Sequence, residues 1–107
     1  MATRESTLHA IRRAFPDSST VAEQPTGDLQ TFKVDRRVLL DLARHLKSDP
    51  ELDFKLLLDV CGVDYRDRPE RFEAVYHLAS LTHGHRLRLK VPLPESAPVM
   101  RNARSML

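Results

Sequence analysis

The chain has 107 residues, which suits one domain with one modest hydrophobic core. Its formal net charge is +2 with 30% charged residues, and acidic side chains are interleaved with the basic ones, which disfavours a nucleic-acid binder. A single cysteine excludes an intramolecular disulfide and a cysteine-ligated iron–sulfur cluster or structural zinc site within this chain.

The first predicted element is a helix over residues 7–15. Thr3 or Ser6 can cap its start, and Pro16 ends it. Its apolar residues recur at helical spacing: Leu8, Ile11 and Phe15.

Two short extended segments are predicted next, around residues 19–23 and 29–34. The intervening sequence Pro-Thr-Gly-Asp predicts a turn, in which Gly27 supplies the permissive backbone.

The clearest helix opens at Asp35 and is stopped by Pro50, because proline disfavours a helical residue before it. Charged residues fill the face opposite the apolar stripe. The stripe itself consists of Leu39, Leu42, Ala43 and Leu46.

From Phe54 onward the hydrophobic period changes to two, which predicts three strands: residues 54–61, 72–79 and 86–91. In the first, Leu57 and Cys61 fall on the second face, so we expect a strand covered on both sides. A hairpin turn at Gly84 separates the last two. The expected fold is α+β, with a mainly antiparallel sheet, a C-terminal three-strand meander and two helices packed on one face. We expect residues 1–107 to form a single domain, with 96–107 as a flexible or atypical tail.

No residue set predicts catalysis, a cofactor or a metal site. His77, His83 and His85 surround a hairpin and are interpreted as polar turn residues rather than metal ligands. Cys61 lies in an apolar strand and is interpreted as a small hydrophobic residue rather than a nucleophile. The acidic residues of the charged connection alternate with arginines, which favours solvated ion pairs. These are Asp64, Asp67 and Glu70.

A row of cations is the best candidate for partner docking. Arg86, Arg88 and Lys90 share one face of the last strand. The simplest interpretation is a solvated strand face, and the functional one is a docking surface for an acidic partner.

Residues 54–95 carry a resemblance to a known family. A strand ends in Gly62-Val63-Asp64-Tyr65, a charged connection follows, then "RFEAVYHLASL", a polar hairpin and "RLRLKVPLPE". This combination resembles the C subunit, also called the 30 kDa-type subunit, of the proton-pumping NADH:quinone oxidoreductase, respiratory complex I. The resemblance implies a subunit without cofactors or catalytic residues of its own, in the hydrophilic arm. Tyr65 and the cation row would then serve docking.

The same resemblance implies partners and a location. The partners are the D-type subunit, which helps form the quinone site, and iron–sulfur subunits, with no nucleic acid bound. No apolar run approaches the ~20 residues of a membrane span, and the N-terminus lacks a secretory signal's apolar core, so we expect a cytoplasmic chain or one peripheral to the cytoplasmic face of the membrane through the complex.

Two features depart from the family pattern. Cys61 stands where the family usually has a threonine or another small residue, and the sequence contains neither tryptophan nor the family's acidic C-terminal signature. We therefore expect it to correspond to the N-terminal part of the family, as a truncated, frameshifted or natural short form. Alternative hypotheses are a free-standing protein-binding module and an accessory subunit of a related membrane-bound hydrogenase.

Overall fold

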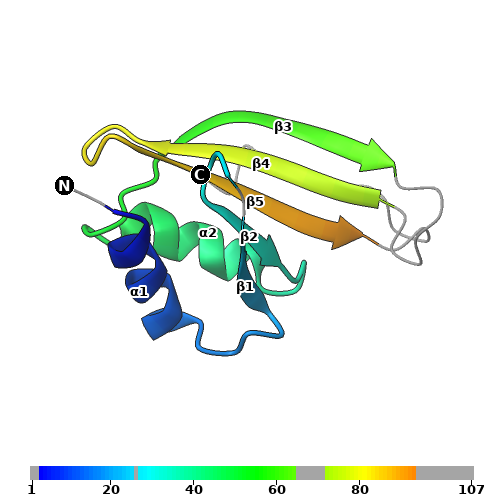
Figure 1. Cartoon of the computed structure of the whole chain (residues 1–107), viewed down its shortest axis with the longest axis horizontal. Coiled ribbons are helices and arrows are strands. Elements are labelled where there is room, and N and C mark those ends of the chain that lie inside the picture. The colour runs from blue at the N-terminus through cyan, green and yellow to red at the C-terminus, as the bar shows by residue number, and fades with distance from the viewer. Residues whose placement is uncertain (1–2, 26, 65–71, 94–107) are drawn as a thin grey trace.

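The computed structural model describes residues 3–25, 27–64 and 72–93 (Figure 1). Tyr65, the rest of the charged connection and the predicted tail at 96–107 lie outside the described residues. The elements in chain order are α1 (Arg4–Ala14), β1 (Val21–Gln24), β2 (Thr31–Val34), α2 (Leu39–Ser48), β3 (Leu56–Asp64), β4 (Phe72–Ser80) and β5 (His85–Leu93).

The strands form one five-stranded sheet in the order β1-β2-β5-β4-β3. The predicted three-strand meander is confirmed, because β3 pairs with β4 and β4 with β5, both antiparallel. At the hairpin between β4 and β5, Gly84 adopts a φ of 61°, a left-handed conformation that glycine reaches without steric cost. The pairing of β2 with β5 is parallel, which period-two patterning does not reveal.

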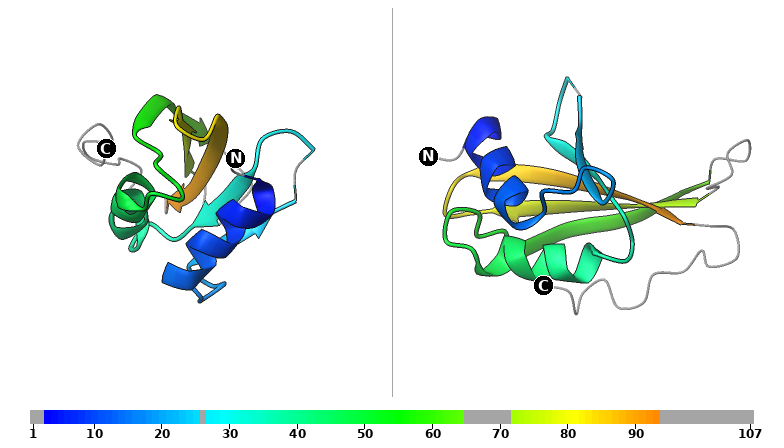
Figure 2. Two further views of the ribbon diagram at one scale, coloured as in Figure 1. Left: turned by 90° about the vertical axis from the view of Figure 1, so that its left-hand side faces the viewer. Right: turned by 90° about the horizontal axis from the view of Figure 1, so that it is seen from below.

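Both helices pack on one face of this sheet, as predicted, and Figure 1 and Figure 2 show them on the same side of the long β3–β5 strands. One hydrophobic cluster joins Ile11 of α1 and Leu46 of α2 to Phe32, Tyr76 and Leu89 of the strands. The architecture is therefore α+β with a mostly antiparallel sheet. Neither described helix has the length and hydropathy needed to cross a membrane.

The start of α1 is set by a capping box three residues before the predicted helix. The Thr3 hydroxyl accepts a hydrogen bond from the Ser6 backbone N–H at 3.1 Å, and the Ser6 hydroxyl accepts one from the Thr3 N–H at 2.8 Å. These bonds satisfy backbone donors that no helical carbonyl can reach. The predicted helix starts later because its apolar spacing begins only at Leu8.

The apolar stripe predicted for α2 is buried as expected, but the helix starts at Leu39 rather than at Asp35. Residues 36–38 form a turn instead. The Asp35 carboxylate accepts the backbone N–H of Arg37 at 2.9 Å, a local bond that competes with helix formation.

The prediction that the first strand of the meander is covered on both sides is wrong. β3 is an edge strand among the described residues, and Leu56, Leu58 and Val60 are 40–45% exposed. The pairing register shifts between Leu57 and Asp59, so that Leu58 is an extra residue in a bulge. A run of apolar residues predicts burial, yet whether the two faces of a strand are covered depends on the segments packed against them.

Candidate functional site

The sheet has one face covered by the helices and one that they leave uncovered, which we call the open face. It carries the three predicted docking cations on β5, together with the residues opposite them on β4 and β2. The register places Arg88 opposite His77 on one side and Thr31 on the other, and Lys90 opposite Val75 and Lys33. The predicted alignment of Arg86, Arg88 and Lys90 on one strand face agrees with this register.

A chain of polar contacts crosses the open face from β3 to the segment before β2. The His77 Nδ1 lies 2.5 Å from Asp59 Oδ1, the Arg88 Nε donates to His77 Nε2 at 3.0 Å, and an Arg88 Nη donates to Asp28 Oδ2 at 3.1 Å. Because an arginine can only donate, the His77 Nε2 must accept, and the ring proton therefore resides on Nδ1 and is donated to Asp59. We call Asp59, His77, Arg88 and Asp28 the cross-sheet chain.

Within the cross-sheet chain, the Arg88 guanidinium donates hydrogen bonds in two directions, to His77 and to Asp28. Its side chain is only 21% exposed, whereas that of Asp28 is 66% exposed. The hydrogen bond from Arg88 holds the pKa of the Asp28 carboxyl below its usual value, against an opposing effect of desolvation. Arg88 thus ties β5 to β4 and to the segment before β2, and this internal role is independent of docking.

The other two cations of the row have no such partners within the part of the chain that the structure describes. No ion pair among the described residues involves Arg86, Lys90 or Lys33. Arg86 is exposed, and Lys90 is half-buried beside Lys33. Docking by the cation row stays a prediction. Arg86 and Lys90 are the better candidates for it, because Arg88 already has partners within the sheet.

The other two histidines of the hairpin, His83 and His85, each hydrogen-bond a segment distant in the sequence. His83 Nε2 donates to the Pro50 carbonyl at 2.7 Å, and His85 Nε2 donates to Gln30 Oε1 at 2.9 Å. Burial, with a smaller effect of Arg4, lowers the pKa of His85, which favours its neutral form. Within the described ranges, no group of three or more His, Cys, Asp and Glu side chains is arranged to hold a metal ion.

The interpretation of Cys61 as a packed small hydrophobic residue is wrong, because its side chain is exposed on the edge strand. Asp64 is also exposed, at the end of β3, while Asp67 and Glu70 lie outside the described residues.

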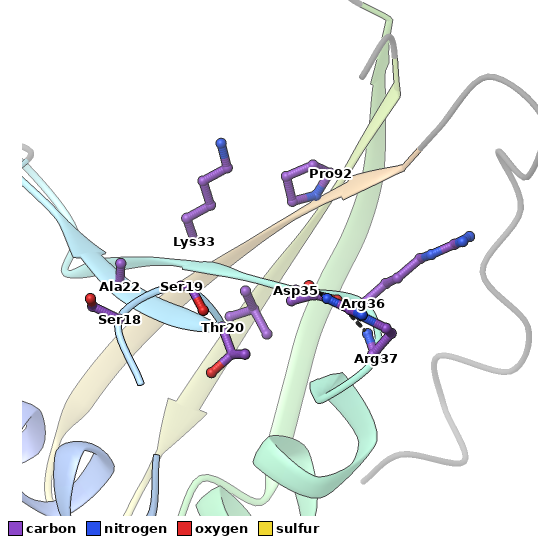
Figure 3. Close-up of a pocket in the computed structure, with 10 residues that line it drawn as sticks. Ser18, Ser19, Thr20, Ala22, Lys33, Asp35, Arg36, Arg37 and Pro92 are labelled. Carbon is purple, nitrogen blue, oxygen red and sulfur yellow. Dashed lines mark hydrogen bonds and ion pairs between the residues drawn. The ribbon is translucent and has the colours of Figure 1, made fainter. Parts of the chain in front are cut away.

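The open face contains a hollow that the sequence does not predict. It has a volume of about 480 Å³ and lies where β1, β2 and β5 meet the turn before α2 (Figure 3). Alternation in β2 places Lys33 on the open face, but the approach of Pro92 on β5 depends on the parallel pairing of the two strands. Its lining consists of Ser18, Ser19, Thr20, Ala22, Lys33, Val34, Asp35, Arg36, Arg37 and Pro92.

The charges in this hollow are only partly balanced. Arg37 Nε and Nη donate to the two carboxylate oxygens of Asp35 at 3.1 and 2.8 Å. These bonds, and that from the Arg37 backbone, lower the pKa of Asp35 to about 2. Arg37 and Asp35 therefore neutralise each other, and Lys33 and Arg36 remain without an ion pair among the described residues.

Comparison with known proteins identifies related chains. The family model described as "Respiratory-chain NADH dehydrogenase, 30 Kd subunit" matches residues 32–106. The C subunit of the NADH-quinone oxidoreductase of Roseiflexus sp. (strain RS-1) is 44% identical over 91 residues, which cover 85% of this chain and 52% of the relative. The corresponding C subunit of Hyphomonas neptunium (strain ATCC 15444) is 38% identical, over 83% of this chain and 44% of the relative. The chain thus spans about half the length of these curated relatives.

A solved structure shares the fold. A chain in the structure of the membrane-bound sulfane sulfur reductase, an archaeal respiratory membrane complex, matches with a TM-score of 0.69 over 84% of this chain and 49% of that chain. The sequence identity is 23%, so this likeness concerns the fold alone.

Proposed function

The chain belongs to the family of the 30 kDa subunit of respiratory-chain NADH dehydrogenase, and from this membership we propose that it is a non-catalytic structural subunit of a proton-pumping NADH:quinone oxidoreductase. The observation that carries the proposal is the family match over residues 32–106, which includes the meander and the cation row on β5. In this role the chain contributes position and contact surface, while cofactors of other subunits transfer electrons from NADH to quinone.

The proposed partners are a D-type subunit, which helps form the quinone site, and neighbouring iron–sulfur subunits. The open face supports a binding role, because Arg86 and Lys90 lack ion pairs among the described residues while the helix-covered face is occupied by the core. Association with the cytoplasmic face of the membrane would follow from these contacts.

The proposal is tested by purifying the tagged chain from solubilised membranes of its source organism and identifying the bound proteins by mass spectrometry. Recovery of the D-type and iron–sulfur subunits, with NADH-dependent quinone reduction in the same fraction, is the expected result. The full-length C subunit of Roseiflexus sp. (strain RS-1), carrying the same tag and added to the same membranes, is the control. If the control recovers these subunits and the chain recovers none of them, the chain does not act as such a subunit.

A further inference from the structure

The hollow at the end of β2 combines apolar surface with two cations, Lys33 and Arg36, that form no ion pair among the described residues, although the charge of Arg36 also helps to lower the pKa of Asp35. Ala22 and Pro92 supply apolar lining, and Figure 3 shows Lys33 and Arg36 extending outward while Arg37 lies against Asp35. Because the Asp35–Arg37 pair is neutral, the two remaining side chains give the hollow a net positive charge. A volume of about 480 Å³ holds a few side chains rather than a single ion.

The same positive charge continues along the open face. Lys33 and Lys90 are direct neighbours in the pairing of β2 with β5, and cross-strand like charges repel. Neither ammonium has an acidic partner within the described part of the chain. An anionic group placed between them and Arg36 would remove this repulsion, so the surface is complementary to negative charge.

The donors in the hollow are unsuited to an isolated phosphate. Phosphate sites use converging backbone N–H groups, often with glycines, and the described residues of this lining include no glycine. Two of its hydroxyls are already used: Ser19 Oγ donates to Asp17 Oδ1 at 2.7 Å, and Thr20 Oγ1 donates to the Asp17 carbonyl at 2.9 Å. Apolar lining beside outward cations instead fits a peptide with an apolar side chain next to an acidic one.

We propose that this hollow docks a segment of a partner protein that places an Asp or Glu side chain against Lys33 and Arg36 and an apolar side chain against Ala22 and Pro92. This inference rests on the proposed function, since the partner is then another subunit of the complex. The main docking contact then lies at the end of the sheet where β2 lies beside β5, and not in the middle of the cation row on β5.

The first experiment tests the chemistry on the full chain without any other subunit. The backbone amide signals of the isotope-labelled chain are followed by NMR during titration with three probes: a seven-residue peptide alternating Glu and Leu, the same peptide with Gln for Glu, and inorganic phosphate. The Glu peptide is expected to shift the signals of Lys33 and Arg36 and to bind at least about fivefold more tightly than the Gln peptide.

Matched charge reversals locate the binding. Lys33→Glu is expected to weaken binding of the Glu peptide about fivefold or more, and Arg44→Glu, on the exposed side of α2, to leave it unchanged. Arg86→Glu changes the cation row on the open face outside the hollow. It is therefore expected to leave binding of the Glu peptide unchanged if the peptide binds in the hollow. Equal binding of the Glu and Gln peptides, an equal loss with Arg44→Glu, or equally tight binding of phosphate alone would overturn the proposal.

The second experiment uses the complex purified with the tagged chain. A zero-length carbodiimide joins lysine amines to carboxylates in contact, and mass spectrometry is expected to find Lys33 linked to an Asp or Glu of another subunit. Lys33→Arg should abolish this link while the complex is still recovered. Recovery of the complex with no link at Lys33, and unaffected by Lys33→Glu, overturns the hollow as a docking site and leaves the proposed function intact. Seating of the Glu peptide in the hollow, with no complex recovered, refutes the proposed function alone.

Discussion

Tyr76 offers a test of the core in which removing one atom should stabilise the protein. The side chain lies on β4, is 2% exposed and packs in the main hydrophobic cluster. Its hydroxyl is buried and has no hydrogen-bond partner among the described residues. Tyr76→Phe keeps the ring and removes the hydroxyl, and therefore relieves the desolvation cost of this unpaired group.

The magnitude follows from that cost. A buried polar group without a partner costs ~1–3 kcal/mol, so its removal stabilises the protein by that amount. The small void left by the oxygen offsets part of this stabilisation, and we expect a net gain of ~1 kcal/mol in the free energy of unfolding. For a domain of this size such a gain raises Tm by roughly 4–8 °C. Tyr76→Leu, which also removes ring packing, is expected instead to lose ~1–2 kcal/mol.

The pH dependence supplies a second readout. Burial raises the pKa of Tyr76 above its usual value of 10.0. Below that pH the phenol is protonated in both states and does not affect the balance between them. Above it, the unfolded chain loses the proton first, which stabilises the unfolded state, so the stability of the wild type falls as the pH rises. Tyr76→Phe removes this contribution, and its advantage over the wild type should grow above pH ~10.

Urea unfolding followed by circular dichroism at pH 7 and pH 10.5 measures both effects. The reasoning is refuted if Tyr76→Phe lowers the free energy of unfolding at pH 7, since the hydroxyl would then contribute a favourable hydrogen bond.

Three further predictions concern the surface. For Asp35, whose pKa falls from 3.8 to about 2 because Arg37 donates to it, stability is present above pH ~4 and is lost as the pH falls through about 2. Melting temperatures at pH 5 and pH 2.5 should therefore differ less in Asp35→Asn than in the wild type, and an equal difference contradicts the pairing. For His77, correlation of the ring nitrogens with the ring protons by NMR should find the neutral ring protonated on Nδ1, and a ring protonated on Nε2 would exclude the cross-sheet chain. On the exposed edge of β3, Leu58→Glu should reduce concentration-dependent self-association measured by sedimentation velocity, and a wild type that stays monomeric at high concentration refutes this expectation.

The local sequence pattern was sufficient to predict which residues are buried where a helix or strand packs against a single core. The i, i+3, i+4, i+7 stripe of Leu39, Leu42, Ala43 and Leu46 is buried in α2, and the alternation in β5 puts Leu87, Leu89 and Val91 inside. In both cases burial depends on a period that is written in consecutive residues. The starts of both helices differ from the predicted ones, because they depend on side-chain bonds to the backbone, as at Thr3 and Asp35.

The sequence by itself determined the α+β class, the antiparallel meander, the buried faces and the resemblance to the 30 kDa subunit family, because each of these is carried by contiguous residues. The tertiary structure alone decided which strand lies at an edge and which segments meet. It exposed Leu58 and Cys61, joined Asp59 to Asp28 through His77 and Arg88, and set Lys33 beside Lys90 next to the hollow. A hydrophobic period states which way a side chain points but not which strand lies beside it, and strand order is settled only when distant segments share one core.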